Sequence, residues 1–271
     1  MTRAQQNSSQ ITKKPYDKLY NQEFYDNQVS GSYRSAKKYA AILWPLYKPT
    51  SVVDVGCGRG TWLKAFKDNG VETLVGFDGS WNSQENMVDE AIVFYDVELN
   101  KPFTNIANQR FDLAMSLEVA EHLEPSSAEL FIENLTKLSD VVLFGAAFTK
   151  QGGTNHVNEQ PHTYWADIFS RFDYTPFDLF RPIVWGDKDI EFCYQQNTFL
   201  YVRKSTQVFE NLLSLGECPL ENLYFLNCIH PLLYEFHADH SYKSLINQLV
   251  IKSLPSPLVP FARKLKHYLF G

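Results

Sequence analysis

Short apolar runs alternate with stretches whose apolar positions recur every three or four residues, and this alternation fills the middle of the chain. The short runs predict strands, because strands buried on both faces read as continuous hydrophobic segments. The expected strands are 51–55, 73–77, 91–95, 111–116 and 141–148, with two late strands near 177–185 and 197–202. The expected core helices are 61–69, 126–138 and 162–172. Strands alternating with helices predict an α/β fold, with seven strands in a parallel sheet and helices on both faces.

The regions on either side of this core have a different pattern. Aromatic residues recur at helical spacing before the first strand, which predicts one or two helices broken near Ser30-Gly31. The basic and apolar segment 261–270 is expected to dock on its own domain, with an anionic membrane or a partner as the alternative. The chain divides into a loosely held arm and helical lid (1–47), a core (48–204) and a helical C-terminal extension (205–271).

Composition and charge narrow the class of ligand. The 271 residues are 44% hydrophobic and include 20 Phe and 15 Tyr, enough to fill a sizeable core. The formal net charge is −6, and the chain has no long basic run. We therefore expect no nucleic-acid partner. A small polar ligand needs only a few well-placed side chains and remains compatible with this composition.

The lengths of the apolar runs and the spacing of the cysteines favour a soluble protein with reduced thiols. No apolar run reaches the roughly 18 residues that span a bilayer, and the polar start MTRAQQNSSQITKK lacks the apolar part of a signal peptide. The spacing of the cysteines fits neither a zinc ribbon nor a disulfide framework. The cysteines are Cys57, Cys193, Cys218 and Cys228. We expect reduced thiols, a cytoplasmic location and no stable membrane insertion, while the sequence leaves the oligomeric state open.

A glycine-rich turn follows the first predicted strand in the sequence VVDVGCGRG, with glycines at Gly56, Gly58 and Gly60. Ligands of parallel sheets bind beyond the carboxyl ends of the strands. Glycines there allow the backbone to approach a ligand closely. This spacing alone also suits nicotinamide or flavin dinucleotides, so its neighbours decide the interpretation.

Acidic residues end the first three strands. Asp54 is expected either to hold the turn by accepting backbone N–H bonds or to reach a ligand ammonium group through water. Asp78 is placed to accept both hydroxyls of a ribose, and Asp96 or the N–H of Val97 is placed to meet an adenine edge. Such an acidic crevice disfavours a pyrophosphate. It suits S-adenosylmethionine, which carries a sulfonium and an ammonium group and has no phosphate.

The segment 53–60 resembles motif I of the class I S-adenosylmethionine-dependent methyltransferases, and Asp78 and Asp96 match their acidic positions. FDLAMSLEVAEHL, at 111–123, resembles their strand-four motif. The resemblance covers 51–148 and implies a Rossmann-like methyltransferase sheet with S-adenosylmethionine as cofactor. The cofactor contacts that it implies are Asp54, Gly56, Cys57, Gly58, Gly60, Asp78, Gly79, Asp96, Val97 and Leu117.

Candidate chemistry follows the fourth strand, in Glu118-x-x-Glu121-His122, with His156 further along. Two carboxylates and two imidazoles can hold a divalent ion such as Mg²⁺ or Mn²⁺. The motif Glu118-x-x-Glu121-His122 resembles the metal-binding segment of small-RNA 2′-O-methyltransferases and of some ubiquinone-pathway O-methyltransferases. Glu121, His122 and His156 are the expected catalytic residues, the two histidines as candidate bases. The alternative that the acids only cap the turn stays open.

A long polar loop follows the fifth strand and is expected to contact the acceptor. The alternative is a loop whose polar groups satisfy one another. The expected substrate contacts are Asn158, Gln160, His162, Trp185 and Asn197. GGTNHVNEQPHTYW, together with YQQN, resembles a bacterial methyltransferase subgroup associated with surface-polysaccharide and small-molecule pathways. That resemblance implies O-methylation of a sugar, a nucleotide-sugar or a phosphorylated modifier.

Other interpretations stay open at this point. An RNA ribose 2′-O-methyltransferase would need a basic surface that the composition lacks, and a nicotinamide-dependent oxidoreductase could share the glycine turn. The N-terminal aromatic segment is expected either to pack in the core or to bring Tyr25, Ser32, Arg34 or Ser35 near the cofactor carboxylate.

Overall fold

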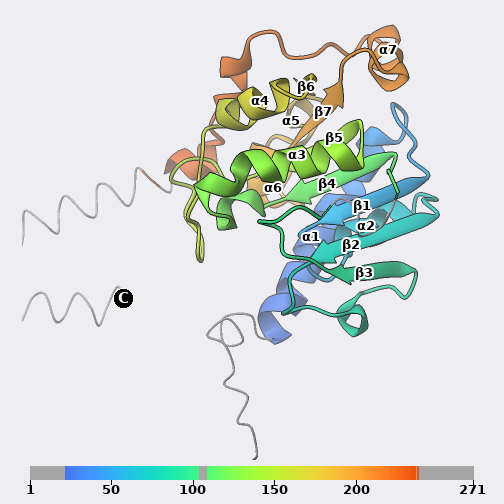
Figure 1. The fold of residues 1–271 in the computed structure, drawn as a ribbon. Coiled ribbons are helices and arrows are strands. Elements are labelled where there is room, and N and C mark those ends of the chain that lie inside the picture. The colour runs from blue at the N-terminus through green and yellow to red at the C-terminus, as the bar shows by residue number, and fades with distance from the viewer. Residues whose placement is uncertain (1–21, 104–108, 236, 238–271) are drawn as a thin grey trace, which may run out of the picture. The chain divides into compact units, whose positions relative to one another are not determined.

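The computed structural model describes residues 22–103, 109–235 and 237 (Figure 1). The described residues up to Asn227 belong to one compact unit, and the described residues from Cys228 to His237 belong to a second. In the second unit, residues 231–235 are helical. The expectations for the first 14 residues and for 261–270 lie outside the described residues.

A seven-stranded sheet forms the centre of the first unit, in the order β3-β2-β1-β4-β5-β7-β6. The strands are β1 (Ser51–Val55), β2 (Thr73–Asp78), β3 (Ile92–Asp96), β4 (Leu113–Leu117), β5 (Val141–Gly145), β6 (Tyr174–Phe177) and β7 (Phe199–Arg203). The first five are parallel, whereas β7 runs antiparallel between β5 and β6. The chain leaves β1 toward β3 and returns to β4. The order therefore reverses between β1 and β4, where sheets of this kind bind ligands.

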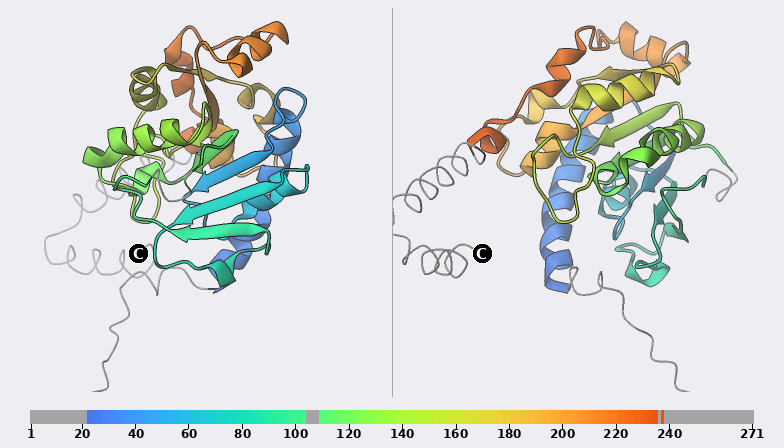
Figure 2. Two further views of the ribbon diagram at one scale, coloured as in Figure 1. Left: turned by 45° about the vertical axis from the view of Figure 1, so that its right-hand side comes forward. Right: turned by 60° about the vertical axis from the view of Figure 1, so that its left-hand side comes forward.

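Helices cover both faces of the sheet, as expected (Figure 2). The helices packed through one buried cluster are α1 (Gln22–Leu43), α2 (Thr61–Lys67), α5 (Arg181–Val184), α6 (Phe192–Asn197) and α7 (Gln207–Ser214). The opposite cluster contains α3 (Ala128–Leu138) and α4 (His162–Ser170). Short 3₁₀ turns lie at η2 (Gln84–Asn86), η3 (Ala120–His122), η4 (Pro125–Ser127) and η5 (Leu223–Asn227).

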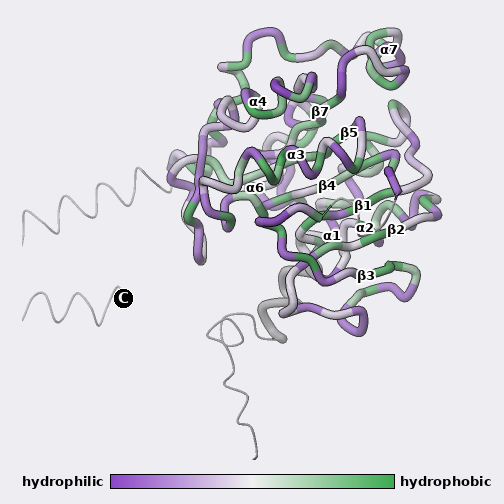
Figure 3. The backbone as a smooth tube through the Cα atoms, in the orientation of Figure 1, coloured by the Kyte–Doolittle hydropathy of each residue, from purple (hydrophilic) through white to green (hydrophobic). Residues whose placement is uncertain are grey.

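The pattern of buried residues explains the two layers. Along β1, Val52 belongs to one cluster and Val53 and Val55 to the other, because successive strand side chains point to opposite faces. On α3 the hydrophobic and hydrophilic stretches alternate with the helical period (Figure 3). Every residue of β5 is buried, as its continuous apolar sequence predicts.

The helix break predicted near Ser30-Gly31 is wrong, because α1 runs through both residues. A Cβ added at Gly31 would come within 2.1 Å of Glu191 Oε1. The glycine therefore allows close packing between α1 and the segment before α6. The Oγ of Ser35 donates to the Gly31 carbonyl at 3.0 Å and keeps this turn of the helix hydrogen-bonded.

The strand predicted near 177–185 is also misplaced. The strand β6 ends at Phe177, and α5 occupies Arg181–Val184 with Pro182 in its first turn, where a proline fits a helix well. Arg181, only 5% exposed, pairs with Asp178 at 2.7 Å and donates to the carbonyl oxygen of Leu226. Charge pairing therefore overrides the apolar pattern in this segment.

The remaining core elements were predicted to within a few residues. The bounds of β1 and the first residue of α4 agree fully with the prediction. The helix α2, which follows the glycine turn, ends two residues before its predicted end. Within the predicted C-terminal extension, α7 and η5 belong to the first compact unit, and Leu212 is fully buried in its core. Among the described helices, none combines the length and apolar character needed to cross a bilayer.

Candidate cofactor and acceptor site

A pocket opens beyond the carboxyl ends of β1 and β4, at the point where the strand order reverses. The glycine turn, the end of β4, and the helices α1, α2 and α6 contribute its walls. The lining residues are Ser32, Asp54, Gly56, Cys57, Gly58, Arg59, Thr61, Trp62, Leu117, Glu118 and Tyr194. Five of the cofactor contacts implied by the sequence resemblance, Asp54, Gly56, Cys57, Gly58 and Leu117, therefore line one pocket.

The glycine turn needs its glycines for different reasons. Gly56 has φ +84° and lies against Val119, whose Cγ2 would be 2.3 Å from an added Cβ. Gly58 has φ +52° and has no neighbouring atom within 4 Å of an added Cβ. The first glycine therefore allows tight packing, and the second leaves open space in the pocket wall. Gly60 lies against Ile92, outside the lining.

Asp78 holds the glycine turn in place. Its two carboxylate oxygens accept hydrogen bonds from the backbone N–H groups of Gly58 and Gly79, each at 2.7 Å. Burial raises the pKa of Asp78 to about 6, although these hydrogen bonds oppose the shift. The carboxylate lies at the end of β2, where its predicted contact with a ribose remains compatible with the fold.

Asp54 is 5% exposed and lines the pocket. Within the described residues, no hydrogen bond to its carboxylate is seen. Burial, with a contribution from the nearby charge of Asp78, raises its pKa to about 8. Of the two roles predicted for Asp54, the structure gives the first, holding the turn, to Asp78. Asp54 remains available to a cationic ligand.

The adenine contact predicted from the backbone of Val97 is wrong, because its N–H donates to the carbonyl of Asp78 at 2.8 Å. Asp96 pairs with Asp78 across the β2–β3 register, and its side chain is exposed. Of the two adenine contacts predicted here, Asp96 and the N–H of Val97, only the carboxylate of Asp96 therefore remains a candidate.

Hydroxyl groups from the helices α1, α2 and α6 meet in the wall of the pocket. The Oγ of Ser32 lies 3.1 Å from the Oγ1 of Thr61, and the hydroxyl of Tyr194 donates to Ser32 at 3.3 Å. The sequence pointed to Ser32 but missed Thr61 and Trp62, because they read as ordinary residues of an amphipathic helix. Arg34, also expected here, is exposed and does not line the pocket.

Glu118 follows β4 and also lines the pocket. Its Oε1 accepts from Asn197 Nδ2 at 2.7 Å, and its Oε2 accepts from Gln151 Nε2 at 2.9 Å. Asn197 Nδ2 also donates to Gln151 Oε1 at 2.9 Å, which closes a three-residue network. Burial raises the pKa of Glu118, and the two amide donors oppose this shift.

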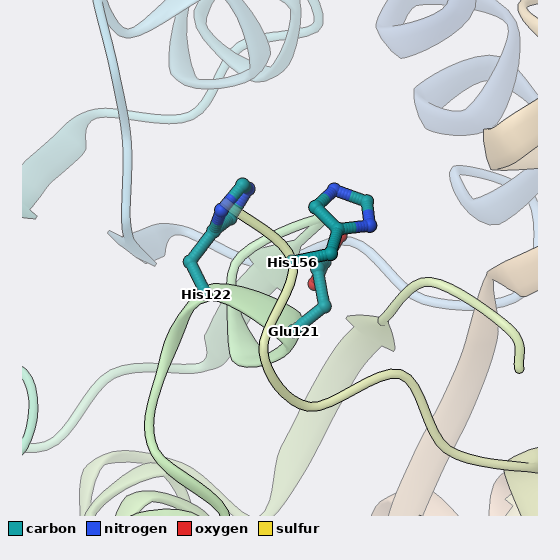
Figure 4. Close-up of side chains that lie close together, drawn as sticks. All are labelled: Glu121, His122 and His156. Atoms are coloured by element: carbon teal, nitrogen blue, oxygen red, sulfur yellow. The ribbon is translucent and has the colours of Figure 1, made fainter. Parts of the chain in front are cut away.

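Glu121, His122 and His156 form a separate group, whose ligand atoms lie within 4.8 Å of one another. Their side chains project from two neighbouring loops toward a common space (Figure 4). Glu118, the fourth predicted metal ligand, is not part of this group, and its oxygens are engaged by amides. The structure therefore brings together three of the four residues predicted to bind a metal.

The three residues differ in exposure, since Glu121 is buried, His156 is partly buried and His122 is exposed. Glu121 is 0% exposed, and no side chain of the described residues donates a hydrogen bond to either of its oxygens. Burial and the neighbouring Glu118 raise the pKa of Glu121 well above its usual range. Desolvation of the imidazole and the nearby His156 lower the pKa of His122 and favour its neutral form.

The polar loop after β5 is anchored to the same turn. Val157 and Asn158 donate backbone N–H bonds to the carbonyl of Glu121 at 2.9 and 3.0 Å. His156 Nδ1 lies 2.8 Å from Glu159 Oε1, which also accepts the N–H of Gly152. These bonds fix the position of the His156 imidazole beside Glu121.

The five predicted substrate residues occupy different environments. Asn158 is 1% exposed and accepts a hydrogen bond from Gln160. His162 is 1% exposed between Phe148 and Phe199, where burial lowers its pKa to about 3. Asn197 is fully buried and holds Glu118, whereas Trp185 is 37% exposed on the surface. None of the five lines the pocket, and His162 is a core residue in this structure.

The order of the strands and the pocket at the β1–β4 switch point are those of a Rossmann-like α/β protein, a class whose ligands bind at this point of the sheet. Comparison with known proteins narrows this class. Residues 25–145 match the family described as "Methyltransferase domain". Residues 25–145 are therefore similar to a methyltransferase domain, and the order of the strands agrees with an α/β fold of that kind.

One curated relative is the mitochondrial ubiquinone biosynthesis O-methyltransferase of Dictyostelium discoideum, 30% identical over 112 residues. The match covers 35% of this chain and 34% of that protein, so it spans about a third of the relative's length.

Solved structures share the fold at low sequence identity. An O-methyltransferase family protein from Burkholderia thailandensis is 13% identical with a TM-score of 0.51, and the match covers 70% of this chain and 62% of that one. The plantazolicin methyltransferase in complex with SAH is 12% identical with a TM-score of 0.51, over 71% of this chain and 92% of that one. At these identities the likeness shows the fold alone.

Proposed function

We propose that this protein is an S-adenosylmethionine-dependent methyltransferase that methylates a hydroxyl oxygen of a small polar acceptor with the help of a divalent cation. The acceptor class is a sugar, a nucleotide-sugar or a phosphorylated modifier of a bacterial polysaccharide or small-molecule pathway. One observation carries the proposal. A pocket lined by the unpaired carboxylate of Asp54 and by Glu118 is followed along the chain by η3, where the ligand atoms of Glu121 and His122 lie within 4.8 Å of that of His156.

The pocket has groups to match each part of the cofactor. Asp78, at the end of β2, would accept the ribose hydroxyls. Asp54 would bind the ammonium group, since a buried carboxylate gains most from a cation. Ser32 and Thr61 would donate hydroxyl hydrogen bonds to the methionine carboxylate. The match to the methyltransferase family favours this cofactor over a nicotinamide dinucleotide.

The donor set of the second group fits a divalent ion. The buried carboxylate of Glu121 has no side-chain donor, and His122 is held in its neutral form, the form that binds metals. Glu159 would orient His156 as a carboxylate partner commonly orients a ligating imidazole. Two imidazole nitrogens favour Mn²⁺ over Mg²⁺, which prefers oxygen ligands.

Methyl transfer requires alignment more than covalent catalysis. The acceptor oxygen attacks the methyl carbon in line, the carbon–sulfur bond breaks, and its electron pair stays on sulfur to give S-adenosylhomocysteine. A bound divalent ion would lower the pKa of the acceptor hydroxyl. The hydroxyl proton would then pass to water, and only without a bound ion would the neutral imidazole of His122 be free to act as the base. The helices α1 and α6 contribute Ser32 and Tyr194 to the pocket wall, where they would help to limit access of water to a bound cofactor.

The first test is binding and turnover with purified full-length protein. Titration calorimetry should detect S-adenosylhomocysteine and no NAD(P). Transfer from S-adenosylmethionine labelled on the methyl group should be measured with sugars, nucleotide-sugars, phosphorylated modifiers, phenols and short RNA. Loss of turnover in chelator, restored by Mn²⁺, would support the metal. Transfer to RNA alone would favour the alternative of a ribose 2′-O-methyltransferase.

The location of the protein is part of the proposal. The four cysteines, all within the described residues, form no disulfide. Reduced thiols fit the cytoplasm, where S-adenosylmethionine would be available to the pocket. Fractionation of cells that express the full chain tests this placement.

A further inference from the structure

Glu118 is not part of the group formed by Glu121, His122 and His156, and its carboxyl group lies in the wall of the cofactor pocket. We propose that Glu118 is the counter-charge for the sulfonium of the cofactor, and that it makes the pocket prefer S-adenosylmethionine to S-adenosylhomocysteine. The inference rests on the proposed function, since it assigns a specificity-determining residue within the same pocket.

The position of Glu118 carries the first part of the argument. Asp78 lies at the end of β2, on one side of β1, and Glu118 follows β4 on the other side. The sulfonium joins the ribose to the methyl group that is transferred. A cofactor whose ribose meets Asp78 and whose methyl group faces His122 must place its sulfur between them. Glu118 lines the pocket together with Leu117, directly after β4 and four residues before His122.

The network around Glu118 carries the second part. Asn197 and Gln151 each donate to a different carboxylate oxygen, at 2.7 and 2.9 Å. Amide donors favour the ionised form of a carboxylate and fix its position. Each oxygen keeps further lone pairs for interaction with a cation. Burial raises the pKa of Glu118 against these donors, so a bound cation would stabilise the ionised carboxylate, and charge interactions in a partly desolvated wall are stronger than in water.

The backbone supplies a third, independent observation. Glu118 has φ +57°, in the left-handed region that a residue with a side chain rarely occupies. The Glu118 N–H donates to the carbonyl of Gly145 at 2.9 Å, which holds this conformation. Such strain persists where the surrounding structure fixes it, often at functional sites. Asp54, nine-tenths buried and without a hydrogen-bond partner in the described residues, lines the same pocket and independently indicates a cationic ligand.

A charge at this position affects substrate and product differently. The two cofactor forms share the ammonium and carboxylate groups, and only S-adenosylmethionine carries the sulfonium charge. Transfer of the methyl group removes that charge. The attraction to Glu118 is then lost, and the pocket releases the product more readily than it releases the substrate.

The experiment compares three ligands in chelator, by titration calorimetry of the full chain. The ligands are S-adenosylmethionine, S-adenosylhomocysteine and sinefungin, which carries an amine in place of the methylated sulfur. Glu118→Gln should weaken binding of the two cationic ligands about 10- to 100-fold and binding of S-adenosylhomocysteine less than threefold. Glu124→Gln, an exposed glutamate in the same segment, is the matched control and should change none of the three.

Two results would overturn the inference. Equal losses of affinity for all three ligands would assign Glu118 to the shared ammonium group. A preference that wild type shows only with Mn²⁺ would make Glu118 a metal ligand instead. Retained binding of S-adenosylhomocysteine shows that the variant is folded, and Glu118→Asp, which keeps the charge, should retain the preference. Wild type that binds none of the ligands would refute the proposed function itself.

Discussion

The buried carboxylate of Asp54 predicts an unusual dependence of stability on pH. Its pKa rises from 3.8 to about 8 on folding, mainly through burial. Because the folded-state pKa is the higher one, its contribution to stability is fully present below pH 3.8 and is lost as the pH rises through 8. In the window between pH 5 and pH 7 the folded protein keeps a proton that the unfolded chain has released.

Each pH unit in that window costs about 1.4 kcal/mol of unfolding free energy for one such group. From pH 5 to pH 7 the cofactor-free wild type should therefore lose about 3 kcal/mol through Asp54. Asp54→Asn removes the titrating group and should remove this part of the slope. Asp78, whose pKa is raised to about 6, adds a smaller slope to both proteins.

Urea unfolding at pH 5, 6 and 7, followed by circular dichroism, measures the effect. The variant should be the more stable protein at pH 7, with an unchanged m-value. Asp112→Asn is the control. Burial raises the pKa of Asp112, but hydrogen bonds from Thr50 and Ser51 outweigh it and lower the pKa, so this variant should lose stability at neutral pH. If the unfolding free energy changed equally with pH in wild type and in Asp54→Asn, the assignment of a buried, unpaired carboxylate would be refuted.

Other predictions test the turn, the ribose contact and the metal group. Asp78→Ala should weaken binding of S-adenosylhomocysteine at least about tenfold, and unchanged affinity by calorimetry would exclude the ribose contact. Gly56→Ala should lower the unfolding free energy by about 2–4 kcal/mol, because its Cβ would meet Val119 at a positive φ, whereas Gly58→Ala should cost only about 1 kcal/mol. Glu121→Gln should abolish Mn²⁺ binding, measured by electron paramagnetic resonance, while cofactor affinity changes less than about threefold. Retained stoichiometric Mn²⁺ binding would remove Glu121 from the metal group.

Much of the fold could be predicted because the relevant signals are local. The strands beside the glycine turn are short apolar runs, and Asp54 and Asp78 stand at their ends. The wrong predictions lie where contacts between residues far apart in the sequence determine the local structure. Gly31 reads as a helix breaker until Glu191 is seen beside it, and Arg181 reads as part of a strand until its pairing with Asp178 is known.

The candidate site was predicted less completely than the fold, for the same reason. Glu118 and Glu121 stand three residues apart in one motif, and the sequence assigned both of them to one metal site. The structure separates them, because Asn197 and Gln151 engage Glu118 while Glu121 faces His156. Thr61 and Trp62 carry no motif, so only their meeting with α1 and α6 shows that they line the pocket.

The position of β7 has a consequence for how the protein is made. This last strand pairs with β5 on one side and β6 on the other, and α6, which closes the pocket with Tyr194, directly precedes it. Ser32 and Tyr194 meet across 162 positions of sequence. A nascent chain on the ribosome can form the first parallel strands early. It cannot complete the cofactor pocket until residues near 200 have left the exit tunnel, so cofactor capture should come late in synthesis.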